Sequence, residues 1–207
     1  MRVIVADPKT AKGAATRARI IDAAAALVYE RGLDSVGIND IREATSTSWG
    51  QIFYYFPDGR VQLLRALVDR QALQALDDQR PELDALDSWD SWREWRNHLL
   101  AVHSAHGAGG GCPLGSLTAQ LSESDPGARR LIDAGFGVWL SHFKRGLETM
   151  RGNGDLAPDV DVPALAEAIL AIVQGGFVLM QASRSIQALS NALDAALLML
   201  RGAGSSG

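Results

Sequence analysis

The apolar residues of this chain recur about every three to four positions along most of its length, which is the spacing of amphipathic helices. No window of about four to eight residues alternates clearly enough to favour a strand over a helix. The few prolines lie between the periodic runs. We therefore expect an all-α protein with about nine helices, which cover about residues 14–31, 38–44, 48–54, 58–79, 88–106, 113–123, 126–151, 162–184 and 187–201.

Several of the predicted helices are bounded by residues that favour a helix end. Gly32 follows the first helix at the position where a C-cap favours glycine. Ser88 can cap the helix that starts beside it, and Asp125 followed by Pro126 is a typical helix start, with proline in the first turn. These signals support the helix boundaries independently of the periodicity.

The pattern predicts two structural units. Residues 1–57 hold three helices and form a compact N-terminal unit, while residues 58–202 form a larger helical bundle. The helix that begins near residue 58 joins the two units without a flexible linker. Residues 203–207 are rich in glycine and serine, and we expect a disordered tail there.

Charge and cysteine content narrow the class of protein. The net charge is -4, but residues 1–60 carry eight Lys or Arg and seven acidic residues, against 12 and 17 in the remainder. This balance excludes a protein that wraps nucleic acid with its whole surface, and it permits a local basic patch near the N-terminus. The single cysteine, Cys112, fits a reducing compartment.

Membrane signals are weak. The N-terminus has no apolar run long enough for a signal peptide, and the most apolar stretch, 164–180, is short for a membrane span. Glu167 and Gln174 also interrupt that stretch. We expect a cytoplasmic protein without membrane contact.

Residues 35–56 carry the most informative pattern. Ile38 and Ile41 give a short helix one apolar face, residues 45–47 form a polar turn, and Ser48 can cap the next helix. In that second helix we expect three side chains to pack inward (Ile52, Phe53 and Phe56), while the others face solvent (Trp49, Gly50, Gln51, Tyr54 and Tyr55).

A short helix that exposes aromatic and polar side chains without a charge is typical of the recognition helix of a helix-turn-helix. The alternative is an ordinary helical hairpin whose tyrosines are merely amphipathic, but short exposed helices contribute little to stability. For Trp49, packing within the N-terminal unit and contact with DNA both remain open.

The N-terminal segment resembles the TetR family of repressors over about residues 14–70. The resemblance is carried, at the family's spacing and without a gap, by Thr16–Ala24, Tyr29–Gly32, Ile41, Ser48, Gly50 and Phe53–Pro57. It implies a DNA-binding helix-turn-helix followed by a ligand-binding and dimerisation domain. Further along, residues 111–121 resemble the LmrA/YxaF-like branch, which implies sensing of an aromatic or amphipathic compound.

The chain departs from the family pattern at three positions. Ser46 stands where the family usually has glycine in the turn, and Trp49 stands where a lysine or arginine is common. Gly59 replaces the lysine that usually follows Phe-Pro, with Arg60 beside it. We expect Arg17 and Arg60 to contact phosphates. The full set of predicted DNA-binding residues is Arg17, Ser46, Ser48, Trp49, Gln51, Tyr54, Tyr55 and Arg60.

The C-terminal unit is rich in aromatic residues. Three of the five tryptophans lie in the helix at 88–106, and an aromatic wall with a few polar groups is typical of a ligand pocket. The alternative is that these aromatics are simply core. The residues predicted to line the pocket are Trp89, Trp92, Leu99, His103, Cys112, Phe136, Trp139 and Phe143. The glycine-rich segment 107–111 could then open the pocket mouth.

Other chemistry is less well supported. The four histidines have no carboxylate or cysteine placed to complete a metal site, so we expect no metal and no cofactor. No nucleophile, base and orienting group can be assembled, so we do not expect an enzyme. Cys112 precedes Pro113 at a predicted helix start, where a thiol pKa is lowered, which leaves redox sensing open.

The last two predicted helices are apolar over wide faces. A single helical bundle cannot bury all of this apolar surface. A two-fold dimer through both helices would bury the excess. We expect this interface at Leu165, Ile169, Ile172, Gly176, Leu189, Leu193 and Leu197.

Together these features predict a repressor that binds palindromic operator DNA as a dimer and is released by a small effector. The alternatives are a ligand-binding protein that has lost DNA binding, and a redox-sensing repressor that acts through Cys112.

Overall fold

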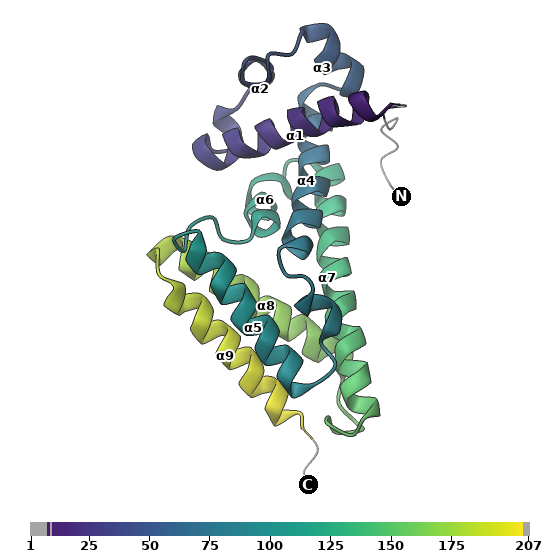
Figure 1. Ribbon diagram of the computed structural model, residues 1–207, viewed down its shortest axis with the longest axis vertical. Helices are drawn as coiled ribbons and strands as arrows, with labels where there is room; N and C mark the ends of the chain where they lie inside the picture. The colour runs from purple at the N-terminus through teal and green to yellow at the C-terminus, as the bar shows by residue number, and fades with distance from the viewer. Residues whose placement is uncertain (1–7, 9, 205–207) are drawn as a thin grey trace.

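The computed structural model describes residue 8 and residues 10–204, and this part of the chain consists of helices joined by loops, without a strand (Figure 1). The all-α prediction is therefore confirmed. The helices are α1 (Ala11–Arg31), η1 (Leu33–Ser35), α2 (Ile38–Thr45), α3 (Trp49–Tyr55), α4 (Arg60–Asp77), η2 (Glu82–Ala85), α5 (Trp89–Ala105), α6 (Pro113–Leu121), α7 (Pro126–Gly152), α8 (Val162–Ser183) and α9 (Ile186–Gly202), where η marks a 3-10 helix.

Helices α1, α2 and α3 form a small unit at one end of the molecule, which we call the head (Figure 1). Its core consists of fully buried side chains from each helix, among them Ile20, Ile41 and Ile52. Gly32 has φ 79°, a backbone angle that favours glycine, and it ends α1 as expected. Burial of these apolar faces against one another holds together helices that are too short to be stable alone.

Helix α4 runs without a break from the head into the rest of the molecule, which we call the body (Figure 1). It begins after Gly59, whose φ is 62°. Near the head, Arg70 Nε of α4 donates to Asp22 Oδ1 of α1 over 3.1 Å. Further along, α4 packs on α7 and α6. The head is therefore attached through a continuous helix.

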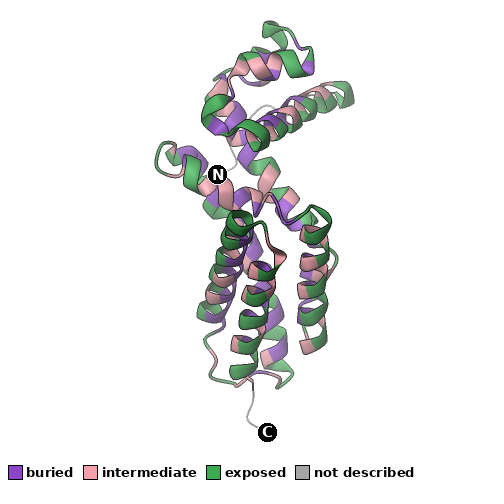
Figure 2. Ribbon diagram, turned by 90° about the vertical axis from the view of Figure 1, so that its left-hand side faces the viewer, coloured by how far each residue is buried: buried purple, intermediate pink, exposed green. Residues whose placement is uncertain are grey.

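The body packs α5, α7, α8 and α9 around one apolar core, and Figure 2 shows buried residues on the inner sides of its helices. Helices α8 and α9 are closely paired, because Gly176 lets the Ala192 side chain approach the α8 backbone. Gly146 of α7 performs the same role for the loop after η2, since a Cβ at Gly146 would lie 2.8 Å from the Leu86 carbonyl carbon.

The end of the chain differs from the predicted disordered tail. Gly204 forms an isolated bridge with Leu156, and the Ala157 N–H donates to the Ala203 carbonyl over 3.0 Å. These backbone hydrogen bonds hold residues 203 and 204 against the loop after α7. Residues 205–207 lie outside the described residues.

Candidate nucleic-acid interface and ligand cleft

The turn between α2 and α3 is tight and contains a strained residue. Ser46 has φ 50° and ψ 35°, the left-handed conformation that glycine adopts without a penalty. The Thr47 N–H donates to the Arg42 carbonyl over 3.1 Å, and the Thr45 hydroxyl donates to the Ile41 carbonyl over 2.7 Å. These bonds hold Ser46 on the surface at the point where the two helices meet.

Helix α3 begins with a capping box. Ser48 Oγ accepts from the Gln51 N–H over 3.2 Å, and Gln51 Oε1 accepts in return from the Ser48 N–H over 3.0 Å. Ser48 was predicted to cap this helix, and the hydrogen bond confirms that local structure. The cap occupies Gln51 Oε1, and the Gln51 residue is exposed.

The outer face of α3 carries a layer of aromatic rings. Trp49 stacks on Phe53 with ring centroids 6.0 Å apart, and the Arg42 guanidinium lies 5.5 Å from the Trp49 ring. Phe53 is 46% exposed, so the expectation that it packs inward is wrong. Ile52 and Phe56 fill the inner face, and Phe53 instead lies beside Trp49 near Gly59.

The two tyrosines of α3 lie differently from each other. Tyr54 is 72% exposed, whereas Tyr55 is half-buried and packs against the head core. Their rings meet edge to face with centroids 5.0 Å apart. Tyr54 is therefore open to solvent, on a helix without any charged side chain.

The two predicted phosphate-binding arginines are both held by the head itself. The Arg17 guanidinium lies 5.5 Å from the centre of the buried Phe56 ring. Arg60 donates from Nη2 to the Leu33 carbonyl over 2.7 Å and from Nε to the Val36 carbonyl over 3.2 Å. Arg60 thus supports the chain between α1 and α2.

Sequence reasoning missed two cationic side chains near the predicted interface. Lys12 is exposed on the first turn of α1, and Arg42 covers Trp49. The clustering of basic residues before position 20 was the available signal for Lys12. Arg42 carried no such signal, because its approach to Trp49 depends on the turn at Ser46.

The predicted aromatic pocket is a packed core in this structure. Trp92, Trp95, Trp139 and Phe143 are all buried, and Phe143 contacts each of the three tryptophans with ring centroids 5.3 to 6.3 Å apart. Trp95 Nε1 donates to Gln79 Oε1 over 3.0 Å, which satisfies that indole. These rings fill space that an open pocket would need.

The other predicted pocket residues are spread over the body. Leu99 is buried, Phe136 is half-buried against the core, and Trp89 lies beside Gly204 at the end far from the head. Cys112 is buried at the start of α6, where burial raises the pKa of its thiol. The expectation that the helix start lowers this pKa is therefore not met.

A cleft of about 870 Å³ lies between the head and the body. It is lined by the C-terminal half of α1, the middle of α4, the end of α5, the 109–111 segment, α6 and the end of α8. Of the eight predicted pocket residues, only His103 lines it. No local motif marks this cleft, because its walls come from segments far apart in the sequence.

Two features of the cleft bear on what it can bind. His103 packs against Phe177 with ring centroids 4.8 Å apart, and burial lowers its pKa, so the ring is neutral at pH 7. Residues 109–111 line the cleft, and the 107–111 segment has positive φ at Gly107, Ala108, Gly110 and Gly111. A Cβ at Gly110 would lie 3.3 Å from the Tyr29 ring of α1, so head and body meet here.

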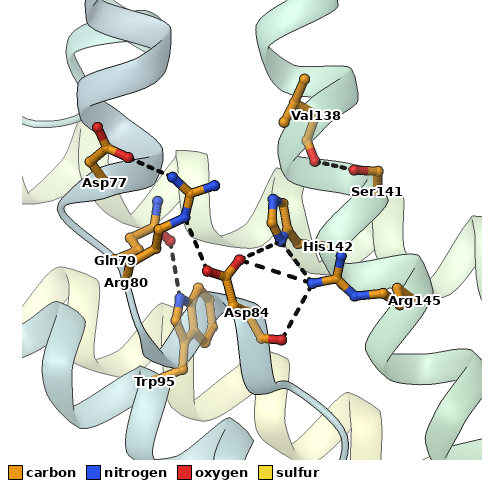
Figure 3. Close-up of polar contacts among 9 residues, drawn as sticks. All are labelled: Asp77, Gln79, Arg80, Asp84, Trp95, Val138, Ser141, His142 and Arg145. Atoms are coloured by element: carbon orange, nitrogen blue, oxygen red, sulfur yellow. Dashed lines mark hydrogen bonds and ion pairs between the residues drawn. The ribbon is translucent and has the colours of Figure 1, made fainter.

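A separate polar network fastens η2 to α7 (Figure 3). The Asp84 carboxylate lies 3.1 Å from Arg80 Nε and 3.2 Å from His142 Nδ1, and Arg145 Nη2 donates to the Asp84 carbonyl over 3.3 Å. Burial, together with the charge of Arg145, lowers the pKa of His142. Among the described residues no three metal-binding side chains gather closely enough to hold an ion.

Most of the predicted dimer residues lie inside a single protomer. Ile169, Gly176, Leu189 and Leu193 are buried between the body helices, Leu165 is buried as well, and Ile172 and Leu197 are half-buried. Both helices instead expose a second apolar stripe. On α8 the exposed residues of this stripe are Ala164, Ala171, Gly175, Val178, Leu179 and Ala182, and on α9 they are Ala195 and Leu198. Ala168 and Met199 are half-buried beside them.

Helix α8 is long and apolar enough to cross a membrane by length and composition alone. The same would hold for a core helix of a soluble bundle, and here α8 packs on α7 and α9. Its inner face belongs to the body core, while its outer stripe remains uncovered in the protomer.

Comparison with known proteins places both parts of the chain in one family. A family model for bacterial regulatory proteins of the tetR family matches residues 20–67. A second model, for the tetracyclin repressor-like C-terminal domain, matches residues 90–196, which is more than half of the chain.

Individual relatives agree with this result. An uncharacterized HTH-type transcriptional regulator in the lacX 3' region of Lactococcus lactis is 27% identical over 86% of this chain and 90% of its own length. An uncharacterized HTH-type transcriptional regulator of Mycobacterium tuberculosis is 40% identical over 53 residues, 26% of this chain and 27% of its own.

Solved structures share the fold. A TetR-family regulator from Cytophaga hutchinsonii superposes with a TM-score of 0.80 at 19% identity, over 97% of this chain and 100% of its own. A TetR transcriptional regulator from Chloroflexus aurantiacus gives 0.75 at 24% identity, over 92% and 96%. With a helix-turn-helix head and a helical body that both match, the chain belongs to the TetR family of transcriptional regulators.

Proposed function

We propose that the protein is a cytoplasmic, non-enzymatic repressor that binds a palindromic operator as a homodimer and releases it when a small molecule binds. The observation that carries this proposal is the outer face of α3. Trp49, Phe53 and Tyr54 are exposed there on a helix too short to gain stability from them. Contact with the major groove gives these side chains a role.

The structure refines how α3 would contact DNA. Trp49, flanked by Arg42, and the exposed hydroxyls of Ser46, Ser48 and Tyr54 are the groups that can reach bases or phosphates without rearrangement. Arg60 would act indirectly, because its guanidinium holds the Leu33 and Val36 carbonyls. Lys12 becomes the candidate phosphate contact on α1.

Mobility shift with DNA from upstream of the protein's own gene tests this proposal. Lys12→Gln should weaken binding to all sequences alike and reduce the slope of log affinity against log salt by about one. Trp49→Ala should change the preference among operator variants. Lys144→Gln, which removes a cation from the body, is the matched control. Wild-type protein that shifts no upstream DNA would support a ligand-binding protein without DNA binding instead.

The exposed apolar stripes of α8 and α9 supply the proposed dimer surface. Val178 of α8 is 63% exposed and Leu198 of α9 is 65% exposed, so each stripe presents a large apolar side chain to solvent. A two-fold axis through these helices would cover both stripes and set two heads at a fixed separation, as a palindrome requires.

Sedimentation tests the dimer. Val178→Asp and Leu198→Asp should give folded monomers that bind the operator weakly, because each complex loses half of its contacts. Val138→Asp changes an exposed valine of α7 outside the stripes and should leave the dimer intact. Leu193→Asp should unfold the protein instead, since Leu193 is buried within the protomer. A wild-type monomer at micromolar concentration would refute this assembly.

The effector is proposed to be an aromatic or amphipathic compound, as the resemblance to the LmrA/YxaF-like branch suggests. Sensing by Cys112 is less well supported, because burial raises the pKa of that thiol and so disfavours the reactive thiolate. The cleft between head and body is large enough for a drug-sized molecule.

A further inference from the structure

The cleft between head and body receives the C-terminal ends of three helices. Tyr29 and Glu30 belong to the last turns of α1, His103 belongs to the last turn of α5, and Arg184 is the C-cap of α8. Each helix C-terminus carries a partial negative charge of about half an electron from its unpaired carbonyls. Among the described lining residues, the helix N-termini at the cleft are that of α6, at Pro113, and that of the short 3-10 helix η1, which follows Gly32.

The side chains add to this negative potential. Glu30 and Asp78 line the cleft, whereas Arg184 is its single permanently charged cation among the described lining residues. His103 is neutral at pH 7 because burial lowers its pKa. Fixed charges and helix ends together therefore favour a positively charged ligand over a negatively charged one.

The cleft also has apolar walls suited to a flat molecule. Val28, Leu67, Val102 and Leu117 line it from four helices. Tyr29 also lines the cleft with 70% of its surface exposed, and an accessible aromatic ring can interact favourably with a cation. A volume of about 870 Å³ falls within the range that drug-sized ligands occupy.

We propose that this cleft binds an amphipathic organic cation with a planar ring system, and that the bound molecule contacts head and body at once. The proposed binding of the cation rests only on the shape and charge of the cleft. The regulatory consequence rests on the proposed function, because a molecule between α1 and the 109–111 segment changes the angle of the head and hence the separation of two heads on one operator.

Fluorescence anisotropy with two dyes of one shape tests the binding step without DNA. A rhodamine methyl ester is a cation, and fluorescein shares its xanthene ring system but is an anion. We expect the rhodamine ester to bind at least about tenfold more tightly, the factor that about 1.4 kcal/mol of favourable electrostatics supplies. Equal or tighter binding of fluorescein, or no binding of the rhodamine ester, overturns the proposal.

Charge variants locate the site. Glu30→Gln and Asp78→Asn should each weaken rhodamine binding by about three- to five-fold, the size of a partly exposed ion pair. Arg184→Gln should strengthen it. Glu94→Gln removes an exposed acid of α5 outside the cleft and should change nothing. An equal effect of Glu94→Gln and Glu30→Gln would show non-specific attraction and overturn the assigned site.

Operator binding in the presence of the dye separates the two proposals. Weakening of operator affinity by about tenfold, lost in Glu30→Gln, supports both. Charge-selective dye binding without any operator binding supports the cleft and refutes the proposed function. Operator release by a different compound, with no rhodamine binding, supports the proposed function and overturns the cleft as a cation site.

Discussion

The contact between Arg65 of α4 and Asp125 at the start of α7 ties the head-bearing helix to the body, and removing it should destabilise the protein by a predictable amount. Arg65 donates from Nε to Asp125 Oδ2 over 3.0 Å and from Nη2 to Oδ1 over 2.8 Å. Asp125 Oδ1 also accepts from the Gly127 and Ala128 N–H groups, which caps α7. One carboxylate thus performs two separable tasks.

The magnitude follows from these two tasks. The side chains are 31% and 15% exposed, so the bidentate pair contributes toward the low end for charge-assisted bonds, about 2 kcal/mol in total. An N-cap contributes about 1 kcal/mol. We expect Asp125→Asn, which keeps the cap, to lower the free energy of unfolding by about 2 kcal/mol and Asp125→Ala by about 3 kcal/mol.

The pH dependence supplies a second readout. The hydrogen bonds from Arg65 hold the pKa of Asp125 below its usual value. The stabilisation is therefore complete above the pKa of the unfolded chain and is lost as pH falls through the lower folded pKa. Urea unfolding should show the gap between wild type and Asp125→Asn at neutral pH, and the gap should shrink below about pH 4.

Gly127 allows the same contact to be disturbed without removing a charge. A Cβ at Gly127 would lie 2.5 Å from Arg65 Nη2, so Gly127→Ala should displace the guanidinium. Gly137→Ala on the same helix meets nothing within 4 Å and should instead stabilise the protein by about 0.5–1 kcal/mol. Equal stability of Asp125→Asn and wild type at neutral pH would refute the reasoning.

Three further predictions concern the turn, the body and the thiol. Ser46→Gly relieves a left-handed serine and should raise the free energy of unfolding by up to about 1 kcal/mol, measured by urea unfolding. Gly146→Ala would force α7 away from the Leu86 backbone and should lower that free energy by about 1–3 kcal/mol in the same assay, whereas a neutral effect would contradict the close approach. Burial raises the pKa of Cys112, so a thiol reagent at neutral pH should modify it only as fast as the protein opens; rapid modification of folded protein would contradict this.

Local signals predicted the helices well, because caps and periodicity act within a few residues. Gly32, Ser48 and Asp125 each occupy the helix end expected for them, and every predicted helix is present within a few residues of its expected bounds. The head could be predicted for the same reason. Phe53 and Tyr55 were exceptions, because Phe53 lies outside the core beside Trp49 and Tyr55 packs against the core.

Which aromatic and apolar residues are buried in the protomer and which face outward could not be predicted, because this depends on tertiary packing. An aromatic stripe looks the same in sequence whether it lines a cavity or, like Trp92 and Trp139, packs around Phe143. Helix α8 is apolar on two sides, so periodicity cannot tell which faces α9. In the structure the side that carries Gly176 packs closely on α9, and Gly175 and Val178 on the other side are exposed to solvent.

The glycine-rich segment 107–111 has a consequence for how this protein can change over time. Gly107, Gly110 and Gly111 have positive φ, a backbone conformation in which any other residue is strained. Surface loops usually accept many substitutions. In a saturation library these three glycine positions should be as intolerant as core positions, so they should remain glycine while neighbouring surface positions change.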